Sequence, residues 1–273
     1  MELIEILKVV VLGIVEGITE WLPISSTGHM LLVDEFIHMN VSDSFKDMFF
    51  VVIQLGAILA VVMLFWDKMW PFQTKDKSKP VIRKDVFSMW FKVVVACIPG
   101  AIVTLLFDDY IEAHLHTPTV IALALVVYGV AFIVIENWNK NRTPKVLALE
   151  DISYKTAFII GLFQVLSIIP GTSRSGSTII GALTIGVSRV AAAEFTFFLA
   201  VPVMIGLSFI KILKFGFSFT SVEFMTLAIG CIVAFLVSVL VIKFLMSYIK
   251  KRDFKIFGWY RIVLGVILLL YFM

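Results

Sequence analysis

Charged side chains are scarce in this sequence: Asp, Glu, Lys and Arg together make up 16% of its 273 residues. Soluble domains carry about 25%, so the composition excludes an ordinary soluble globular protein. The net charge of +3 is small, and its pattern along the chain does not suggest nucleic-acid binding. Only two cysteines are present, Cys97 and Cys231, and both lie in apolar runs, which argues against a disulfide framework or a cysteine metal site.

Apolar residues dominate instead: they make up 60% of the chain, and the mean hydropathy is +1.01. A transmembrane helix needs about 20 mostly apolar residues, whereas the strands of a membrane β-barrel are shorter and alternate in polarity. Six stretches are long enough to span a bilayer: roughly 47–66, 85–107, 119–136, 191–211, 222–246 and 256–273. The sequence therefore predicts an all-α polytopic membrane protein that forms a single integral membrane domain over residues 1–273.

Two further apolar regions, roughly 4–38 and 155–186, are each interrupted by a polar loop. The loop sequences are "PISSTGH" at 23–29 and "PGTSRSG" at 170–176. The apolar halves on either side are only about 12 to 19 residues long, which is short for crossing a membrane. A re-entrant helical hairpin is therefore predicted for each region.

The two interrupted regions also resemble each other. "GIVEGITEWLPISSTGHML" from residue 13 aligns with "GLFQVLSIIPGTSRSGSTI" from residue 161 when one gap is allowed, which places Glu16 opposite Gln164 and Thr27 opposite Arg174. The following apolar stretches match as well, so an internal repeat is predicted, with copy one at about 4–137 and copy two at about 155–273. Three spans separate the interrupted regions, and this odd number predicts an inverted-topology repeat.

Lys and Arg residues predict the orientation, because they are enriched in cytoplasmic loops. The segments 67–84, 139–146 and 247–256 share one side of the predicted topology and carry 13 of them, against 3 in the opposite loops. We therefore expect the first group to face the cytoplasm and the C-terminus to lie outside. The N-terminus also lies outside if 4–38 is a hairpin, and inside if residues 4–22 cross the membrane.

The polar loops are candidates for an anion site. Non-helical backbone inside a membrane must be buried in protein or line a wet cavity, and helix N-termini at such breaks attract anions. Glycine allows close backbone approach, hydroxyls donate hydrogen bonds, and the guanidinium of Arg174 can clamp a phosphate. The candidate phosphate-binding residues are Ser25, Thr27, Gly171, Thr172, Ser173, Ser175, Gly176 and Thr178, with Arg174.

Ionisable residues flank the first loop. Glu16 and Glu20 lie four residues apart, on one helical face, where two carboxylates either raise a pKa or share a cation such as Mg²⁺. His29 could transfer protons or attack phosphorus, and Ser25 and Ser26 are candidate nucleophiles.

Simpler interpretations remain open at these positions. The two glutamates could be polar residues near the membrane surface, His29 a packing residue, and Arg174 an interfacial arginine that extends outward. Arg261 and Glu136, near predicted span ends, are interpreted as anchors.

The segments "EGITEWLPISSTGH" at 16–29 and "PGTSRSGST" at 170–178 closely resemble the two signature motifs of the bacterial undecaprenyl-diphosphate phosphatase family, the bacitracin-resistance type. The resemblance covers essentially the whole chain. It implies hydrolysis of undecaprenyl diphosphate to undecaprenyl phosphate and inorganic phosphate, which recycles the lipid carrier of peptidoglycan synthesis. It further implies bacitracin resistance, location in the plasma membrane among membrane lipids, an outward-opening active site, and dependence on a divalent metal, Mg²⁺ or Ca²⁺.

The resemblance also implies residue roles. Glu16 and Glu20 fit the acidic motif linked to metal and catalysis, Ser26 and His29 fit nucleophile or acid–base roles, and Arg174 fits diphosphate binding. Attack by Ser26 and attack by water with His29 as base both remain open. The oligomeric state and the selectivity for prenyl chain length are not defined by the sequence.

Two other functional classes are compatible with the pattern. Inverted repeats with broken helices are common in secondary transporters, so a lipid-phosphate flippase is the main rival. A structural subunit is the third interpretation, which the cost of ionisable groups in the membrane disfavours.

Overall fold

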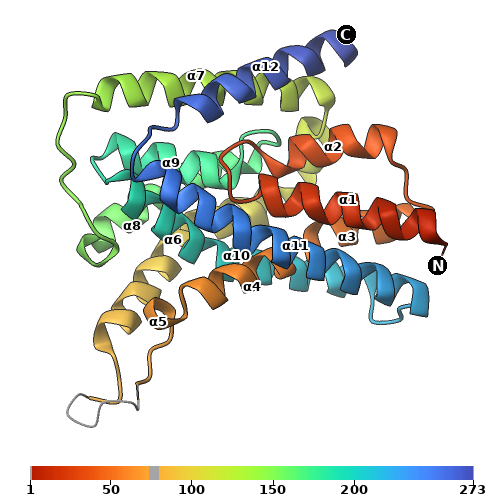
Figure 1. Ribbon diagram of the computed structural model, residues 1–273, viewed down its shortest axis with the longest axis horizontal. Coiled ribbons are helices and arrows are strands. Elements are labelled where there is room, and N and C mark those ends of the chain that lie inside the picture. The colour runs from red at the N-terminus through yellow and green to blue at the C-terminus, as the bar shows by residue number, and fades with distance from the viewer. Residues whose placement is uncertain (1, 74–79, 273) are drawn as a thin grey trace.

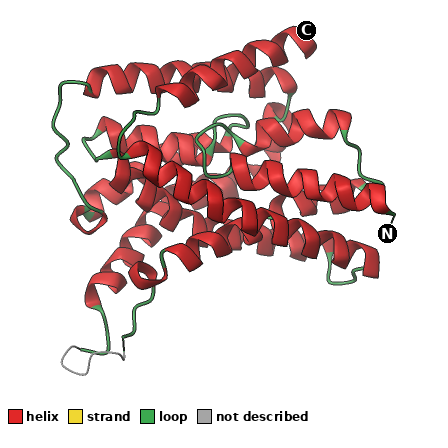
Figure 2. Cartoon of the chain, in the orientation of Figure 1, coloured by secondary structure: helices red, strands yellow, loops and turns green. Residues whose placement is uncertain are grey.

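The computed structural model describes residues 2–73 and 80–272. These residues form helices joined by loops and contain no strand beyond two isolated bridges (Figure 2). The helices are α1 (Leu3–Thr19), α2 (Ser26–Phe36), α3 (Asp43–Val52), α4 (Gln54–Leu64), α5 (Trp66–Met69), α6 (Lys84–Leu115), α7 (Pro118–Asn139), α8 (Tyr154–Val165), α9 (Arg174–Thr184), α10 (Arg189–Phe215), α11 (Ser221–Ile249) and α12 (Lys255–Phe272), with 3-10 turns at Leu149–Asp151 and Leu166–Ile168.

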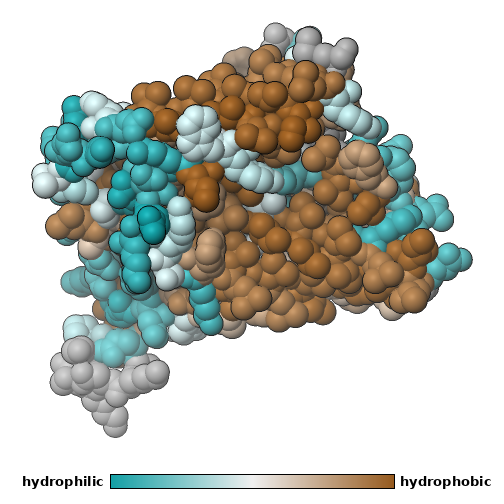
Figure 3. Space-filling model, turned by 45° about the horizontal axis from the view of Figure 1, so that its top comes forward, coloured by the Kyte–Doolittle hydropathy of each residue, from teal (hydrophilic) through white to brown (hydrophobic). Residues whose placement is uncertain are grey.

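The six predicted spans are confirmed. Among the described residues, six helical segments are long and apolar enough to cross a membrane: Asp43–Leu64 (α3 and α4 together), Lys84–Phe107, Pro118–Asn139, Arg189–Phe215, Ser221–Ile249 and Lys255–Phe272. A broad apolar belt covers the visible face between hydrophilic ends (Figure 3). This belt is the surface that a bilayer would cover.

Hydroxyl side chains define where several of these helices begin. At five helix starts, the side chain of the capping residue accepts a hydrogen bond from the backbone N–H three residues later. These residues are Ser42, Thr117, Ser153, Ser188 and Thr220. Such caps satisfy backbone donors that have no partner inside the helix. Pro118 at the start of α7 adds a residue whose backbone is already set for the first turn.

Three pairs of helices pack along each other. Helix α1 packs against α11, α8 packs against α6, and α7 packs along α12 (Figure 1). If the two predicted copies are exchanged, the first of these pairs becomes the second; the internal repeat itself stays a prediction. The orientation of each copy in a membrane stays a prediction.

Glycines allow these matching helix pairs to approach closely. A Cβ atom added to Gly13 of α1 would lie 3.0 Å from the carbonyl oxygen of Gly230 on α11. Gly161, the residue aligned with Gly13, lies in the same way against the carbonyl of Ala96 on α6. Close backbone approach at small residues is the usual way in which helices pack in membranes.

The two chain termini lie at one end of the molecule, and the loops at 140–148 and 250–254 lie at the other (Figure 1). The basic segments 139–146 and 247–256 are therefore grouped in the folded molecule as well as in the sequence. Lys75, Lys77 and Lys79, which contribute to the predicted orientation, lie outside the described residues.

Candidate active site

Two serines with left-handed backbone conformation begin the helices that follow the polar loops. Ser25 has φ of 75° and Ser173 has φ of 74°, and no other described residue except glycine has a positive φ. Ser25 Oγ accepts a hydrogen bond from Gly28 N at 3.3 Å, and Ser173 Oγ accepts one from Gly176 N at 3.1 Å. The two loops thus share one local conformation, and an 11-residue helix follows each of them.

These matching caps correct the sequence alignment by one residue. Because Ser25 corresponds to Ser173, the residue opposite Arg174 is Ser26, and the prediction of Thr27 at that position is wrong. Ser25 and Ser173 have the same separation in sequence as Glu16 and Gln164, so this alignment needs no gap, and Pro23 falls opposite Gly171 instead of Pro170. The first helical residue after the cap is therefore Ser26, the candidate nucleophile, in copy one and Arg174 in copy two.

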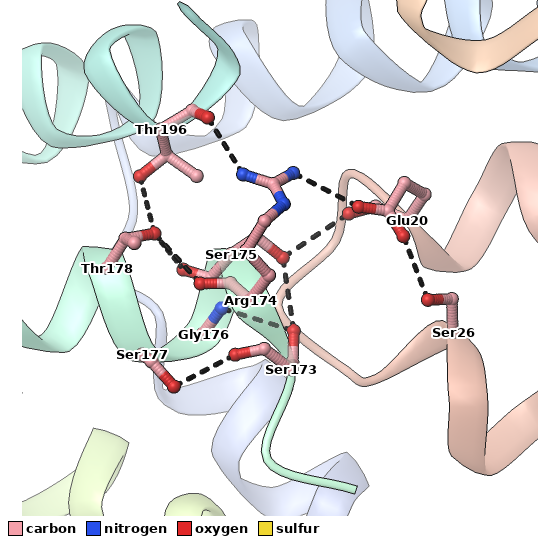
Figure 4. Close-up of polar contacts among 9 residues, drawn as sticks. All are labelled: Glu20, Ser26, Ser173, Arg174, Ser175, Gly176, Ser177, Thr178 and Thr196. Carbon is pink, nitrogen blue, oxygen red and sulfur yellow. Dashed lines mark hydrogen bonds and ion pairs between the residues drawn. The ribbon is translucent and has the colours of Figure 1, made fainter. Parts of the chain in front are cut away.

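The tips of the two loops meet at Glu20. Arg174 Nη2 donates to Glu20 Oε1 at 3.0 Å, and Ser26 Oγ donates to Glu20 Oε2 at 2.8 Å (Figure 4). Ser175 Oγ donates to the backbone carbonyl of Glu20 at 3.3 Å. The structure thus brings together residues that are 154 positions apart in sequence, in a site where Glu20 is 6% exposed.

The guanidinium of Arg174 is held on its other side by α10. Arg174 Nη1 donates to the carbonyl of Thr196 at 2.9 Å, and the hydroxyls of Thr196 and Thr178 lie 2.9 Å apart (Figure 4). Arg174 Nε is buried and has no hydrogen-bond partner among the described residues. Within the described residues, the protein itself therefore leaves this N–H donor unsatisfied. Sequence reasoning missed Thr196, whose signal is a lone hydroxyl within the apolar run "EFTFF".

Glu16 lies on α1, four residues before Glu20, and is 1% exposed. Its Oε1 atom is buried without a hydrogen-bond partner among the described residues. Glu16 lies outside the six candidate spans. Its burial raises the pKa of its carboxyl well above the ordinary value, and the nearby charge of Glu20 adds to this effect. Gln164, the aligned residue in copy two, also has a buried side-chain oxygen without a partner.

These oxygens fit a hard divalent cation. An unpartnered carboxylate oxygen next to a second carboxylate is a donor set of the kind that Mg²⁺ takes, with substrate phosphate and water as further ligands. Three or more His, Cys, Asp or Glu side chains do not cluster anywhere in the described part of the chain. A cation held by Glu16 and Glu20 would therefore need further oxygen ligands, such as the side chain of Gln164, substrate phosphate or water.

His29 lies on α2 and contacts α12 rather than Glu20. Its Nδ1 lies 2.7 Å from the carbonyl of Ser25, so Nδ1 is the donor, and a neutral ring then accepts at Nε2 from the hydroxyl of Tyr260, also at 2.7 Å. The two rings stack at 5.6 Å. His29 is outside the six candidate spans, and burial lowers its pKa, which favours this neutral ring.

Arg261 of α12 connects the two loops by hydrogen bonds to backbone carbonyls of both. Its guanidinium donates to the carbonyls of Gly171 and Thr172 in one loop, both at 2.8 Å, and to Pro23 in the other at 3.1 Å. The side chain is completely buried, so the interpretation of Arg261 as an interfacial anchor is wrong. The three carbonyls lie in non-helical backbone, where each needs a donor.

Glu136 is also not an anchor, because it is 1% exposed and paired with Arg189. This ion pair lies in a different part of the molecule from the polar loops.

The remaining predicted residues differ in their surroundings. Thr27 is exposed, Gly171 has φ of 89° with Ile121 against it, and Thr172 is fully buried with no partner for its hydroxyl among the described residues. Ser173 and Thr178 have their hydroxyls engaged within the protein. Contact of these residues with a substrate stays a prediction.

Comparison with known proteins shows the family to which this chain belongs. A family model described as bacitracin resistance protein BacA matches residues 9–267. The chain belongs to the BacA family. It is 74% identical to an undecaprenyl-diphosphatase of Enterococcus faecalis, over 99% of this chain and 98% of the relative. It is 62% identical to the undecaprenyl-diphosphatases of Lachnoclostridium phytofermentans and Desulfitobacterium hafniense, over 100% of this chain and 99% and 98% of those proteins.

Family membership confirms the resemblance that rests on the two loop motifs. Both motifs lie within the matched residues, and in this BacA family member the structure joins them at Glu20. The roles of individual residues stay predictions.

Proposed function

We propose that the protein is a membrane undecaprenyl-diphosphatase, which hydrolyses undecaprenyl diphosphate to undecaprenyl phosphate and inorganic phosphate. The single observation that carries the site assignment is Glu20, which accepts hydrogen bonds from Arg174 and Ser26 at the same time. Carrier recycling and bacitracin resistance follow from this activity, because the antibiotic sequesters the same diphosphate.

Ser26 is the proposed nucleophile. Its hydroxyl donates to Glu20 Oε2, so the carboxylate is placed to take the proton as Oγ attacks the terminal phosphorus. The bond between that phosphorus and the bridging oxygen breaks, and undecaprenyl phosphate leaves. Water then hydrolyses the phosphoserine and releases inorganic phosphate.

Direct attack by water is the alternative route. His29 would be the base, but its Nε2 lies 2.7 Å from the hydroxyl of Tyr260. This route therefore needs Tyr260 to move or to pass on the proton. The short contact between Ser26 and Glu20 favours the first route.

Arg174 and the surrounding donors stabilise charge on the phosphate. The guanidinium is fixed by Thr196 and Glu20, and its unpartnered Nε and the N-termini of α2 and α9 offer N–H groups to an anion. Glu16 and Glu20 would hold the divalent cation, which when bound neutralises charge on the phosphate oxygens. Other residues need not form covalent bonds with the substrate, because phosphoryl transfer depends mostly on positioning and electrostatics.

The prenyl tail is proposed to stay in the bilayer while the diphosphate enters the site. Many large apolar side chains face outward from the helices, including Leu105, Leu240 and Leu270, so the molecule is surrounded by a surface suited to lipid. With the orientation that Lys and Arg predict, the exposed Thr27 marks access to the site from the outer face.

Phosphate release by purified protein tests the proposed function. Wild-type protein in detergent with undecaprenyl diphosphate and Mg²⁺ should release inorganic phosphate, and EDTA should stop the release. Arg174→Ala and Glu20→Ala should each lose activity by at least about 10²-fold, the usual cost of removing a group that stabilises charge in the transition state. Lys155→Gln, an exposed residue away from the loops, is the matched control.

The outcomes separate an enzyme from a transporter. Folded wild-type protein that binds the substrate and releases no phosphate would contradict hydrolysis and favour lipid transport. Rapid-quench capture of labelled protein tests the covalent route: a label that disappears in Ser26→Ala and persists in His29→Ala supports the serine, and no label under any condition supports attack by water.

A further inference from the structure

A second polar cavity lies away from the loops, at the end of the molecule opposite the chain termini. Its volume is about 820 Å³, within the range of ligand pockets. The ends of α7, α9 and α11, the start of α10 and the loop after α7 form its walls. Helix α9 begins at Arg174 and ends at Thr184 in the cavity wall, so about 16 Å of helix separates the cavity from the site at Glu20.

The cavity carries a strong excess of positive charge. Five cationic side chains line it: Lys140, Arg142, Lys145, Arg189 and Lys250. Its single carboxylate, Glu136, is buried and already accepts hydrogen bonds from Arg189 and from the backbone N–H of Phe254. No ion pair occupies the other four cations within the described part of the chain.

The backbone that carries these charges is held in place. The N–H groups of Lys145 and Val146 both donate to the carbonyl of Gly186, at 2.7 and 3.2 Å. Ser188 N donates back to Val146 O at 2.8 Å, and the side-chain amide of Asn139 donates to Leu183 O at 3.0 Å. The loop after α7 is thereby fastened to the turn between α9 and α10, so the cationic wall is ordered before a ligand arrives.

Part of the cavity lining is apolar. Leu183, Val187 and Ile249 are buried side chains in its lining, and Val190 is half-buried beside them. A cavity lined by ammonium and guanidinium groups and also by hydrocarbon suits an amphipathic anion. Basic pockets between transmembrane helices bind phosphate-bearing lipid head groups for this reason.

We propose that this cavity is a binding site for a phosphate group, distinct from the hydrolytic site. Phosphate monoesters on a lipid and free inorganic phosphate share the chemistry that these cations recognise: Lys140, Lys145, Lys250 and Arg142, whose guanidinium also lies over the Trp138 ring at 3.8 Å. The apolar part of the lining adds affinity for a ligand that carries an acyl or prenyl chain. On the predicted orientation the site faces the cytoplasm, whereas the hydrolytic site opens outward.

Equilibrium binding to purified protein in a zwitterionic detergent tests this site. The probes are short-chain phosphatidic acid, short-chain phosphatidylcholine and inorganic phosphate. Wild-type protein should bind phosphatidic acid and not phosphatidylcholine. The triple variant Lys140→Gln/Arg142→Gln/Lys145→Gln should bind phosphatidic acid at least about tenfold more weakly.

A matched variant separates a built pocket from general surface charge. Lys155→Gln/Lys251→Gln/Arg252→Gln removes the same charge from exposed residues outside the cavity lining and should bind within about twofold of wild type. Both variants should keep wild-type phosphate release, which shows that they are folded. Equal weakening in the two variants, or no binding by wild type, would overturn the proposal.

Competition between inorganic phosphate and phosphatidic acid shows whether the natural ligand is free phosphate or a lipid phosphate. Displacement of phosphatidic acid by millimolar phosphate supports a site that recognises the phosphate alone. Retained phosphatidic acid under the same conditions supports a site for a lipid phosphate, in which the apolar part of the lining contributes to binding.

Discussion

Ser25 and Ser173 show how single residues determine the site. Each holds a left-handed backbone that a residue with a Cβ adopts at a cost of about 1–2 kcal/mol. Each also caps the helix that follows, and the cap orients the next residue, Ser26 or Arg174. The sequence reveals these serines as polar residues behind a proline, but it does not reveal which serine turns the chain.

Substitution of Ser173 tests this role through stability. Ser173→Gly suits the positive φ and loses the cap, and a cap replaced by glycine costs only a few tenths of a kcal/mol. Ser173→Ala loses the cap and keeps the unfavourable backbone, so it should be less stable than wild type by about 1 kcal/mol or more. Thermal unfolding in detergent measures both, with Ser218→Ala in an exposed loop as control. Equal stability of the glycine and alanine variants would contradict the strain.

The residues that sequence analysis missed act through contacts between distant segments. Arg261 lies 238 positions from Pro23, and Thr196 lies 22 from Arg174. No periodicity or spacing reports such pairs. The four residues proposed for catalysis could be found from composition, because carboxylate, hydroxyl, imidazole and guanidinium groups are rare in an apolar chain and cluster in two short motifs.

At the scale of helices, close packing at glycine holds the elements that carry the site. Gly56 of α4 lies directly against the backbone carbonyl of Cys231 on α11, with no room for a Cβ. Helix α11 in turn packs against α1, which ends at Thr19, immediately before Glu20. The position of Glu20 therefore depends on the contacts among α1, α4 and α11.

Two glycine substitutions separate packing from helix propensity. Gly56→Ala should lower stability by about 1–3 kcal/mol, because the added methyl group forces α4 and α11 apart. Gly206→Ala on α10 has nothing within 4 Å of the new Cβ and should be neutral or slightly stabilising. Thermal unfolding of both proteins in one detergent measures the difference. A Gly56→Ala protein as stable as Gly206→Ala would show that the two helices are not closely packed.

The sequence predicts the helices better than their ends. All six predicted spans are confirmed, because 20 apolar residues leave few alternatives in a membrane. Their limits differ by up to four residues, since capping side chains such as Ser188 and Thr220 start helices outside the apolar run. Helix α6 also continues to Leu115, well past its apolar stretch.

At the scale of the whole molecule, charge is distributed unevenly between the two ends. The loops at 140–148 and 250–254 lie opposite the chain termini (Figure 1). Because Lys and Arg remain on the cytoplasmic side, both termini should lie outside. The cavity lined by Lys140 and Lys145 would then face the cytoplasm.

Cysteine labelling tests this orientation in a background with Cys97 and Cys231 replaced by alanine. Ser218→Cys lies at the end with the termini and Thr143→Cys at the other end, and both side chains are exposed. A membrane-impermeant maleimide should label position 218 in intact cells and position 143 only after permeabilisation. The reverse pattern would invert the predicted topology.

The two halves of the chain supply different chemistry to one site. Glu16, Glu20 and Ser26 come from the first half, whereas Arg174 and Arg261 come from the second. Two copies of the first half would pair carboxylates with no guanidinium between them, and two copies of the second would lack the acid. A gene for either half alone could not restore activity by dimerising, although separately expressed first and second halves that reassociate could.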